Sequence, residues 1–72
     1  MFLERIEVSS YEIASIGYDD AQQKLQIEFH NLTIFDYFEV PRDVFEQFVC
    51  ADNIENYFQA HIENYFEVDR VL

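Results

Sequence analysis

Two hydrophobic periodicities meet at Pro41, the only proline of the chain. Before it, residues 24–29 alternate strictly between polar and apolar side chains, which is the two-residue period of a β-strand with one buried face. After it, residues 54–66 place apolar or aromatic side chains three and four positions apart, the period of an amphipathic helix. A chain that changes period once, in this direction, is predicted to fold as a sheet followed by helices.

The fold class is therefore predicted as α+β, a small antiparallel sheet of three to four strands followed by two helices packed on one of its faces. We place the strands within residues 4–40 and the helices at residues 41–51 and 53–67. Pro41 suits a first helical turn, where its missing N–H costs nothing, and Asp52 or Asn53 is a suitable N-cap for the second helix.

The pentapeptide Ile-Glu-Asn-Tyr-Phe occurs at residues 54–58 and again at residues 62–66. An offset of eight residues rotates a helix by about 80° beyond two full turns, so both copies would lie on adjoining parts of one helix face. This favours one long amphipathic helix. The apolar residues after it, within 68–72, are expected to return to the core or to fray.

Residues 33–40 carry apolar side chains at both parities, with Ile34 and Phe38 on one face and Phe35 and Tyr37 on the other. Helices cover only one face of a sheet, so a second aromatic face needs another explanation. It is packed under the N-terminal segment, buried in a homodimer or used to bind a ligand, and the residues alone leave all three open.

The 72 residues carry a net charge of −11, with −6 in residues 1–40 and −5 in residues 41–72. A chain of this length is expected to form a single domain over residues 1–72, because it can bury only about 60% of its unfolded surface. Thirteen Phe or Tyr residues argue against disorder. The charge repels phosphate backbones and anionic membranes, and favours partners with basic surfaces.

Compartment is predicted from cysteine usage and from the first residues. A lone Cys50 cannot form an internal disulfide, and the charged residues 4–5 interrupt any signal-peptide core. We therefore expect a protein of the cytoplasm, or of the host cytoplasm if a virus encodes it, and no membrane partner.

Polar groups on the apolar stripe of the second helix are few, and His61 is the main one. We interpret it as a partly buried core histidine hydrogen-bonded to Tyr18, Ser9 or Ser10, with a pH switch as the alternative. The residues around it do not form a zinc-binding motif.

No catalytic residue, metal site or cofactor is expected. Cys50 with His61 is the only nucleophile and base pair available, and Cys50 follows an apolar helix stripe, where we interpret it as a small core residue. Gly17 is the only glycine, so the chain has no glycine-rich phosphate cradle. The turn at Asp19 and Asp20 does not have the pattern of a calcium loop. We expect a protein that is not an enzyme.

Several short segments, in order and without insertions, resemble the KTSC domain family, named for the C-terminal domain of some lysyl-tRNA synthetases. They are Val8-Ser9-Ser10, Ile16-Gly17-Tyr18-Asp19, the strand at residues 25–29, Phe35-Asp36-Tyr37 at the family's Tyr-x-Tyr, Val40-Pro41, Tyr57-Phe58, His61-Ile62 and Tyr65. The resemblance implies an antiparallel sheet followed by two helices and suggests RNA binding. Leu32 departs from the family, which usually has a turn glycine there.

Three functions are carried forward. The first is a small interaction module, or an inhibitor that mimics nucleic acid, binding a basic protein through acidic side chains on neighbouring helices. These side chains are Glu46, Asp52, Glu55 and Glu63. The second is RNA binding through Phe35 and Tyr37, with Arg42 the only base near them. The third is a homodimer that buries the same two aromatic residues.

Overall fold

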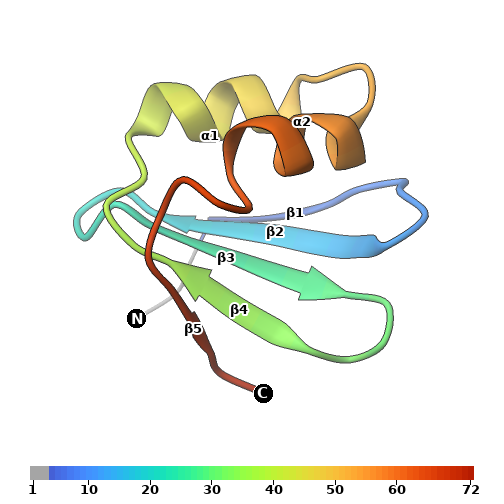
Figure 1. The fold of residues 1–72 in the computed structure, drawn as a ribbon, viewed down its shortest axis with the longest axis horizontal. Coiled ribbons are helices and arrows are strands. Elements are labelled where there is room, and N and C mark those ends of the chain that lie inside the picture. Colours follow the sequence, from blue (N-terminus) through green and yellow to red (C-terminus); the bar gives the residue numbers. More distant parts are fainter. Residues whose placement is uncertain (1–3) are drawn as a thin grey trace.

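The protein folds as a five-stranded antiparallel sheet with two helices on one face (Figure 1). The structure is a computed structural model that describes residues 4–72, with side chains from residue 6 onward. The strands follow one another in the sheet in the order β1-β2-β3-β4-β5. The elements are β1 (Glu4–Glu7), β2 (Ile13–Asp19), β3 (Lys24–Phe29), β4 (Ile34–Tyr37), α1 (Arg42–Val49), α2 (Ile54–His61) and β5 (Val68–Arg70). The predicted α+β class is confirmed, with five strands instead of three to four.

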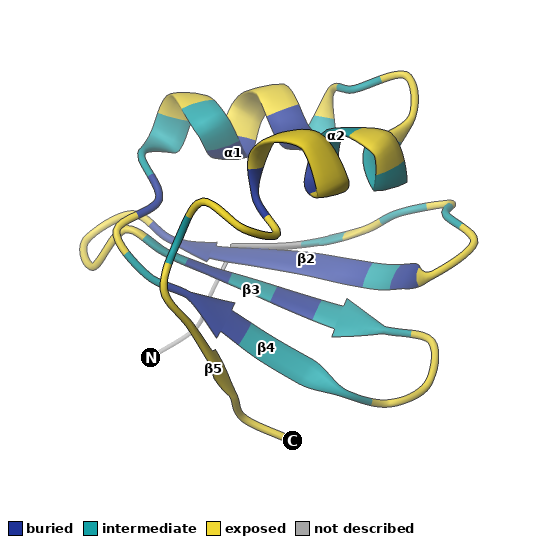
Figure 2. Cartoon of the chain, viewed as in Figure 1, coloured by how far each residue is buried: buried dark blue, intermediate teal, exposed yellow. Residues whose placement is uncertain are grey.

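The core lies between the sheet and the helix layer (Figure 2). Side chains of β2 and β3 that point towards the helices form the sheet side of the core. Paired residues of neighbouring strands face the same way, so Ile16 lies opposite Ile27, and Tyr18 opposite Leu25. The helices supply the upper side. The buried apolar residues are Ile13, Ile16, Tyr18, Leu25, Ile27, Tyr37, Val40, Phe45, Phe48, Phe58 and Ile62.

Tyr18 joins the sheet to α1 through both parts of its side chain. Its ring stacks on Phe45 with a centroid separation of 4.5 Å, and its hydroxyl donates to the Val40 carbonyl at 2.6 Å. The second contact satisfies a buried polar group within the core. This fixes the segment that leads from β4 into α1.

The predicted N-cap Asn53 is confirmed for α2, whereas Pro41, predicted in the first turn of its helix, lies before α1 as the N-cap. Pro41 precedes α1 in an extended conformation, and Asp43 lies in the first turn, where a carboxylate favours the positive end of the helix dipole. The Asn53 side chain accepts a hydrogen bond from the Asn56 N–H at 3.0 Å, so Asn53 is the N-cap of α2.

The predicted second helix is wrong beyond residue 61. Ile62 leaves the helical conformation, with φ −125° and ψ −48°, and both its N–H and that of Glu63 donate to the Phe58 carbonyl. Ile62 is fully buried, so the chain turns down into the core at that residue instead of continuing along the helix. The second copy of the pentapeptide therefore forms a turn, although its apolar residues keep the helical spacing.

The last residues form a fifth strand on the open edge of β4. Val68 pairs with Tyr37 and Arg70 with Phe35, and the Val71 N–H donates to the Ile34 carbonyl at 2.8 Å. The side chains of Val68–Arg70 are all exposed, so the sequence has no alternation of polar and apolar residues from which this strand could be predicted. The segment thus pairs with the sheet edge and contributes no buried side chain.

The outer face of the sheet is polar. Gln26 donates to the Asp36 carboxylate at 3.0 Å, Lys24 lies 3.9 Å from the same carboxylate, and the Ser15 hydroxyl donates to Glu28 at 2.9 Å. These pairs lie on neighbouring strands and face away from the helices. Polar groups on this face are thus paired with one another across the strands.

Leu32 occupies the turn between β3 and β4 with a φ of 71°, in the left-handed region that costs a branched residue free energy. Its side chain is 73% exposed, so little apolar burial is lost on replacement. We expect Leu32→Gly to raise the free energy of unfolding by about 0.5–1 kcal/mol, measured by urea denaturation. The matched control Gln22→Gly, in an exposed turn without positive φ, should lower the free energy of unfolding by a similar amount. A lower free energy of unfolding in both variants would show that the conformation of Leu32 is not strained.

Candidate functional site

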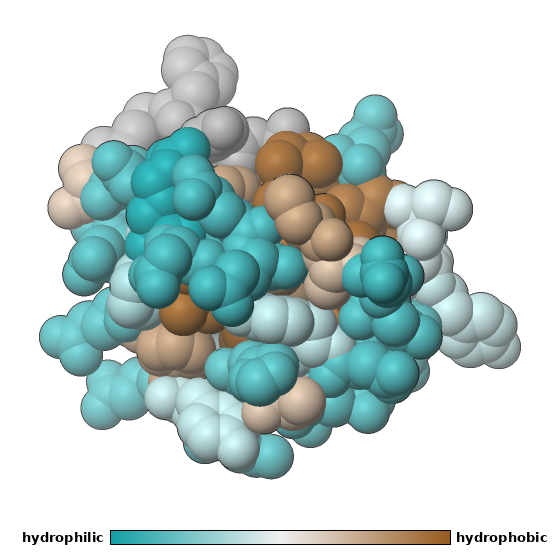
Figure 3. Space-filling model, turned by 90° about the horizontal axis from the view of Figure 1, so that it is seen from above, coloured by the Kyte–Doolittle hydropathy of each residue, from teal (hydrophilic) through white to brown (hydrophobic). Residues whose placement is uncertain are grey.

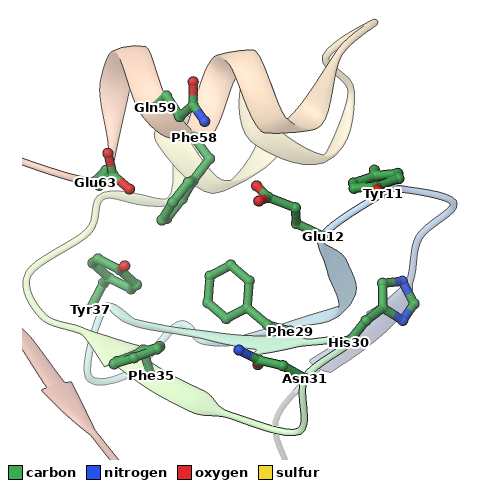
Figure 4. A pocket seen from close by; sticks show the side chains of 10 residues that line it. All are labelled: Tyr11, Glu12, Phe29, His30, Asn31, Phe35, Tyr37, Phe58, Gln59 and Glu63. Carbon is green, nitrogen blue, oxygen red and sulfur yellow. The ribbon is translucent and has the colours of Figure 1, made fainter.

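A cleft of about 490 Å³ lies between α2, the β3–β4 hairpin and the loop that joins β1 to β2 (Figure 4). It is open to solvent on one side and is formed by residues that are distant in sequence. Its lining residues are Tyr11, Glu12, Phe29, His30, Asn31, Phe35, Tyr37, Phe58, Gln59 and Glu63. None of these ten residues is a lysine or an arginine.

Four aromatic rings form the inner surface of the cleft. Phe29 contacts Phe35 and Phe58 edge to face, with ring centroids 5.7 and 5.8 Å apart, and Tyr37 contacts Phe58 in the same way at 5.8 Å. Phe58 and Tyr37 are buried, whereas Phe29 and Phe35 are half-buried. Part of each half-buried ring is therefore available to a ligand in the cleft.

Polar side chains surround these rings, and two of them are exposed carboxylates. Figure 4 shows Glu12 and Glu63 on opposite sides of the Phe58 ring, one on the β1–β2 loop side and the other after the end of α2. The rest of the rim includes the amides of Asn31 and Gln59. The cleft is thus apolar inside and negative at its rim.

The β1–β2 loop is held in place at the cleft by hydrogen bonds to two other elements. The Glu12 N–H donates to the Glu55 carboxylate of α2 at 2.6 Å, and the Glu12 carbonyl accepts from the His30 N–H at 2.9 Å. The His30 Nε2 also lies 3.1 Å from the Ser10 carbonyl. These contacts preform the side of the cleft on which Glu12 stands.

Tyr37 reports the electrostatics of the cleft. Burial, and secondarily the negative charge of Glu63, raise the pKa of the Tyr37 phenol to about 12. The phenol therefore remains neutral at physiological pH. The negative potential of the cleft comes from its carboxylates.

The raised pKa of Tyr37 predicts a loss of stability at high pH. Since the folded pKa of about 12 exceeds the unfolded value of 10.0, the unfolded chain ionises first, and stability present below pH 10 is lost as pH rises towards 12. The loss should approach about 2–3 kcal/mol. Chemical denaturation between pH 9 and about 12 should show a smaller loss for Tyr37→Phe; identical pH dependence in both proteins would refute this assignment.

The predicted aromatic pair lies in this cleft and not on a second, uncovered face. Phe35 and Tyr37 lie opposite Ile27 and Leu25 of β3, on the face that the helices cover. Tyr37 is only 5% exposed, so it offers no ring face on which a base could stack. Asp36, between them in the sequence, points to the outer face of the sheet, where its carboxylate accepts a hydrogen bond from Gln26.

Arg42, predicted to lie near the aromatic pair, is engaged at the start of α1. Its guanidinium lies 3.4 Å from the Asp20 carboxylate and 3.2 Å from that of Glu46, and it stands over the Phe45 ring at 5.8 Å. It does not line the cleft.

The four predicted acidic residues lie in three different surroundings. Glu46 is exposed on α1, and Glu63 lies at the rim of the cleft. Asp52 and Glu55 line a second, polar hollow of about 310 Å³ together with Ser9 and Ser10. Glu55 is half-buried, and its carboxylate accepts the Glu12 N–H, so this side chain also holds the β1–β2 loop to α2.

The interpretation of His61 as a core residue is wrong. The residue is exposed at the end of α2, with its ring 4.6 Å from that of Tyr57. Neither Tyr18 nor the serines bond it: the Tyr18 hydroxyl donates to Val40, and the Ser10 hydroxyl accepts from the Ile13 N–H at 3.4 Å. Ser9 is exposed. The helix buries Phe58 and Ile62 instead, and His61 lies beside that stripe.

Cys50 is also exposed, at the C-cap of α1, which corrects its interpretation as a small core residue. Within the described part of the chain, no three His, Cys, Asp or Glu side chains are grouped so that they could hold a metal ion. No helix among the described residues is long and apolar enough to span a membrane.

Sequence reasoning missed most of the cleft. The alternation in β3 marks Phe29 only as a strand residue, and no sequence pattern marks Tyr11, Glu12, His30, Asn31 or Gln59. They lie in loops and on an exposed helix face, where no periodicity marks them. The excess of aromatic residues on two adjacent strands is the one feature that hinted at an aromatic site.

Comparison with known proteins identifies the family. The sequence model of the KTSC domain matches residues 9–66 of the chain. The chain belongs to the KTSC domain family. The resemblance stated from the sequence is thereby confirmed, and the matched range contains all ten residues that line the cleft.

Relatives of this KTSC domain share its size. The crystal structure of a KTSC domain protein from Yersinia pestis is 30% identical and superposes with a TM-score of 0.94, covering 99% of this chain and 100% of that one. An uncharacterized protein from Stutzerimonas stutzeri (strain A1501) is 32% identical over 56 residues, covering 78% of this chain and 79% of its own. The fold described above is therefore shared with the Yersinia pestis protein over 99% of this chain.

Proposed function

We propose that this KTSC domain is a non-catalytic interaction module that binds a protein with a basic surface. The observation that carries the proposal is the charge of the helix layer. Between Arg42 and Phe66 the chain has no lysine or arginine, and it has five acids there. This stretch contains nearly all of α1, all of α2 and their connections.

Most of the acids face solvent. Among the acids whose side chains the structure describes, ten are exposed: Glu7, Glu12, Asp20, Glu39, Asp43, Glu46, Asp52, Glu63, Glu67 and Asp69. Among the described side chains, ion pairs occupy the carboxylates of Asp20, Asp36 and Glu46. Figure 3, the view onto the helix layer, shows hydrophilic side chains over much of this side, with smaller apolar areas between them. Exposed charges of one sign steer a basic partner towards this side.

Where the partner's basic surface is a nucleic-acid-binding site, the domain would occupy it as an acidic mimic and act as an inhibitor. Such binding needs no reaction, and it suits a protein of the cytoplasm. The same charge disfavours RNA, because phosphate contacts supply most of the affinity in nucleic-acid binding.

A labelled peptide of mixed lysine and arginine serves as the probe for a basic surface. We expect its fluorescence anisotropy to show binding at low salt that weakens as salt rises. Glu46→Lys/Asp52→Lys, on the helix layer, should weaken binding by about tenfold or more, through charge reversal close to the bound peptide.

The control variant Glu7→Lys/Asp69→Lys makes the same change of charge on the two edge strands. It should weaken binding by only about threefold, because these residues are more distant from the helix layer. Equal losses in the two variants, or binding that salt does not affect, would show that the proposal is wrong. Retention of a labelled RNA at micromolar protein in the same buffer would favour RNA binding instead.

A further inference from the structure

The cleft beside α2 combines three properties that together select one kind of ligand. Its inner surface is aromatic, its rim carries the carboxylates of Glu12 and Glu63, and none of its lining residues is a lysine or an arginine. Figure 4 shows the Phe58 ring between the two carboxylates and the Phe29 ring below it. A ligand seated on the exposed parts of these rings would have a carboxylate on either side.

A planar cation fits this arrangement. Aromatic rings attract cations through the negative charge of their faces, and the attraction is strongest where water is excluded. The half-buried rings of Phe29 and Phe35 supply such surfaces. A carboxylate can accept two hydrogen bonds from one guanidinium, and the side-chain oxygens of Asn31 and Gln59 are further acceptors at the rim.

Arginine suits the cleft better than lysine. A guanidinium is flat, more weakly hydrated than an ammonium group, and able to stack on a ring while its edge donates hydrogen bonds. An ammonium group keeps its water more tightly and has no flat surface to stack. The open mouth of the cleft allows the ligand to be a side chain of a larger molecule, and Tyr11 beside it is 90% exposed and free to contact neighbouring residues of that molecule.

We infer that the cleft binds one arginine side chain of the basic partner, with the guanidinium against Phe29 and Phe35 and between the carboxylates of Glu12 and Glu63. This inference rests on the proposed function. In this arrangement the negative charge of the helix layer attracts the basic surface of the partner, and the cleft selects an arginine side chain on that surface. The preformed loop around Glu12 lowers the ordering cost of binding.

Two labelled peptides of equal length and charge, one with arginine only and one with lysine only, test the inference. Wild type should bind the arginine peptide about tenfold more tightly. Glu12→Gln/Glu63→Gln should reduce that preference to about twofold or less, because the cleft loses both charges. Both residues are exposed, so the variant is expected to remain folded, which circular dichroism checks.

The control Glu46→Gln/Asp52→Asn removes the same charge outside the cleft. It should weaken both peptides equally and leave the preference for arginine unchanged. Equal binding of the two peptides by wild type, or a preference that survives in Glu12→Gln/Glu63→Gln, overturns the inference but leaves the proposed function intact. Absence of binding of both peptides at low salt overturns the proposed function itself.

Discussion

Phe58→Ala is expected to lower the free energy of unfolding by about 3–5 kcal/mol, a large share of the stability of so small a domain. Phe58 is 6% exposed and lies at the centre of the aromatic core, where its ring contacts those of Phe29, Tyr37 and Phe48. Truncation would leave a cavity between α2 and the sheet. Urea denaturation followed by circular dichroism measures the change.

The repeated pentapeptide supplies controls for this prediction. Phe66 is the counterpart of Phe58 in the second copy, and Tyr65 is the counterpart of Tyr57. Because the second copy forms a turn, with Phe66 half-buried and Tyr65 67% exposed, Phe66→Ala should cost less than Phe58→Ala, and Tyr65→Ala almost nothing. Equal losses at Phe58 and Phe66 would support the long helix that the periodicity predicts and contradict the structure.

The two copies also show why the sheet was easier to predict from sequence than the end of α2. Alternation in β3 has one geometric meaning, because a one-residue change would move every side chain to the other face. Helical spacing after Phe58 is compatible with two structures, because Ile62 can be buried either by another turn of helix or by a chain that turns into the core. Only the tertiary packing of Ile62, with its non-helical φ and ψ, decides between them.

The remaining misses come from features without a local pattern. β5 is three residues long and fully exposed, and backbone pairing with β4 is what places it. The apolar spacing of α2 predicts a core position for His61, whereas the ring lies against Tyr57 on the exposed side. The cleft depends on the contact of the Glu12 N–H with Glu55, 43 residues apart, which no spacing rule anticipates.

Tyr37→Glu is expected to leave the domain unfolded at pH 7. Tyr37 is 5% exposed beneath α2 and lies close enough to Glu63 for that carboxylate to raise its pKa. A glutamate there would bury a second negative charge near the first, at a cost of several kcal/mol. The whole domain is expected to have only about 4–11 kcal/mol of stability, from about 0.05–0.15 kcal/mol per residue.

The same substitution tests whether this aromatic strand is a homodimer seam. Burial raises the pKa of a carboxyl group, so the folded state favours the neutral glutamate and some structure should return as pH falls towards about 5. Tyr11→Glu makes the same chemical change on a side chain that is 90% exposed, and should remain folded throughout. If this strand were a homodimer interface, sedimentation would show a dimer for wild type and a folded monomer for Tyr37→Glu. Because the Tyr37 ring is packed in the core and has no room to contact a second chain, we expect Tyr37→Glu to be unfolded instead.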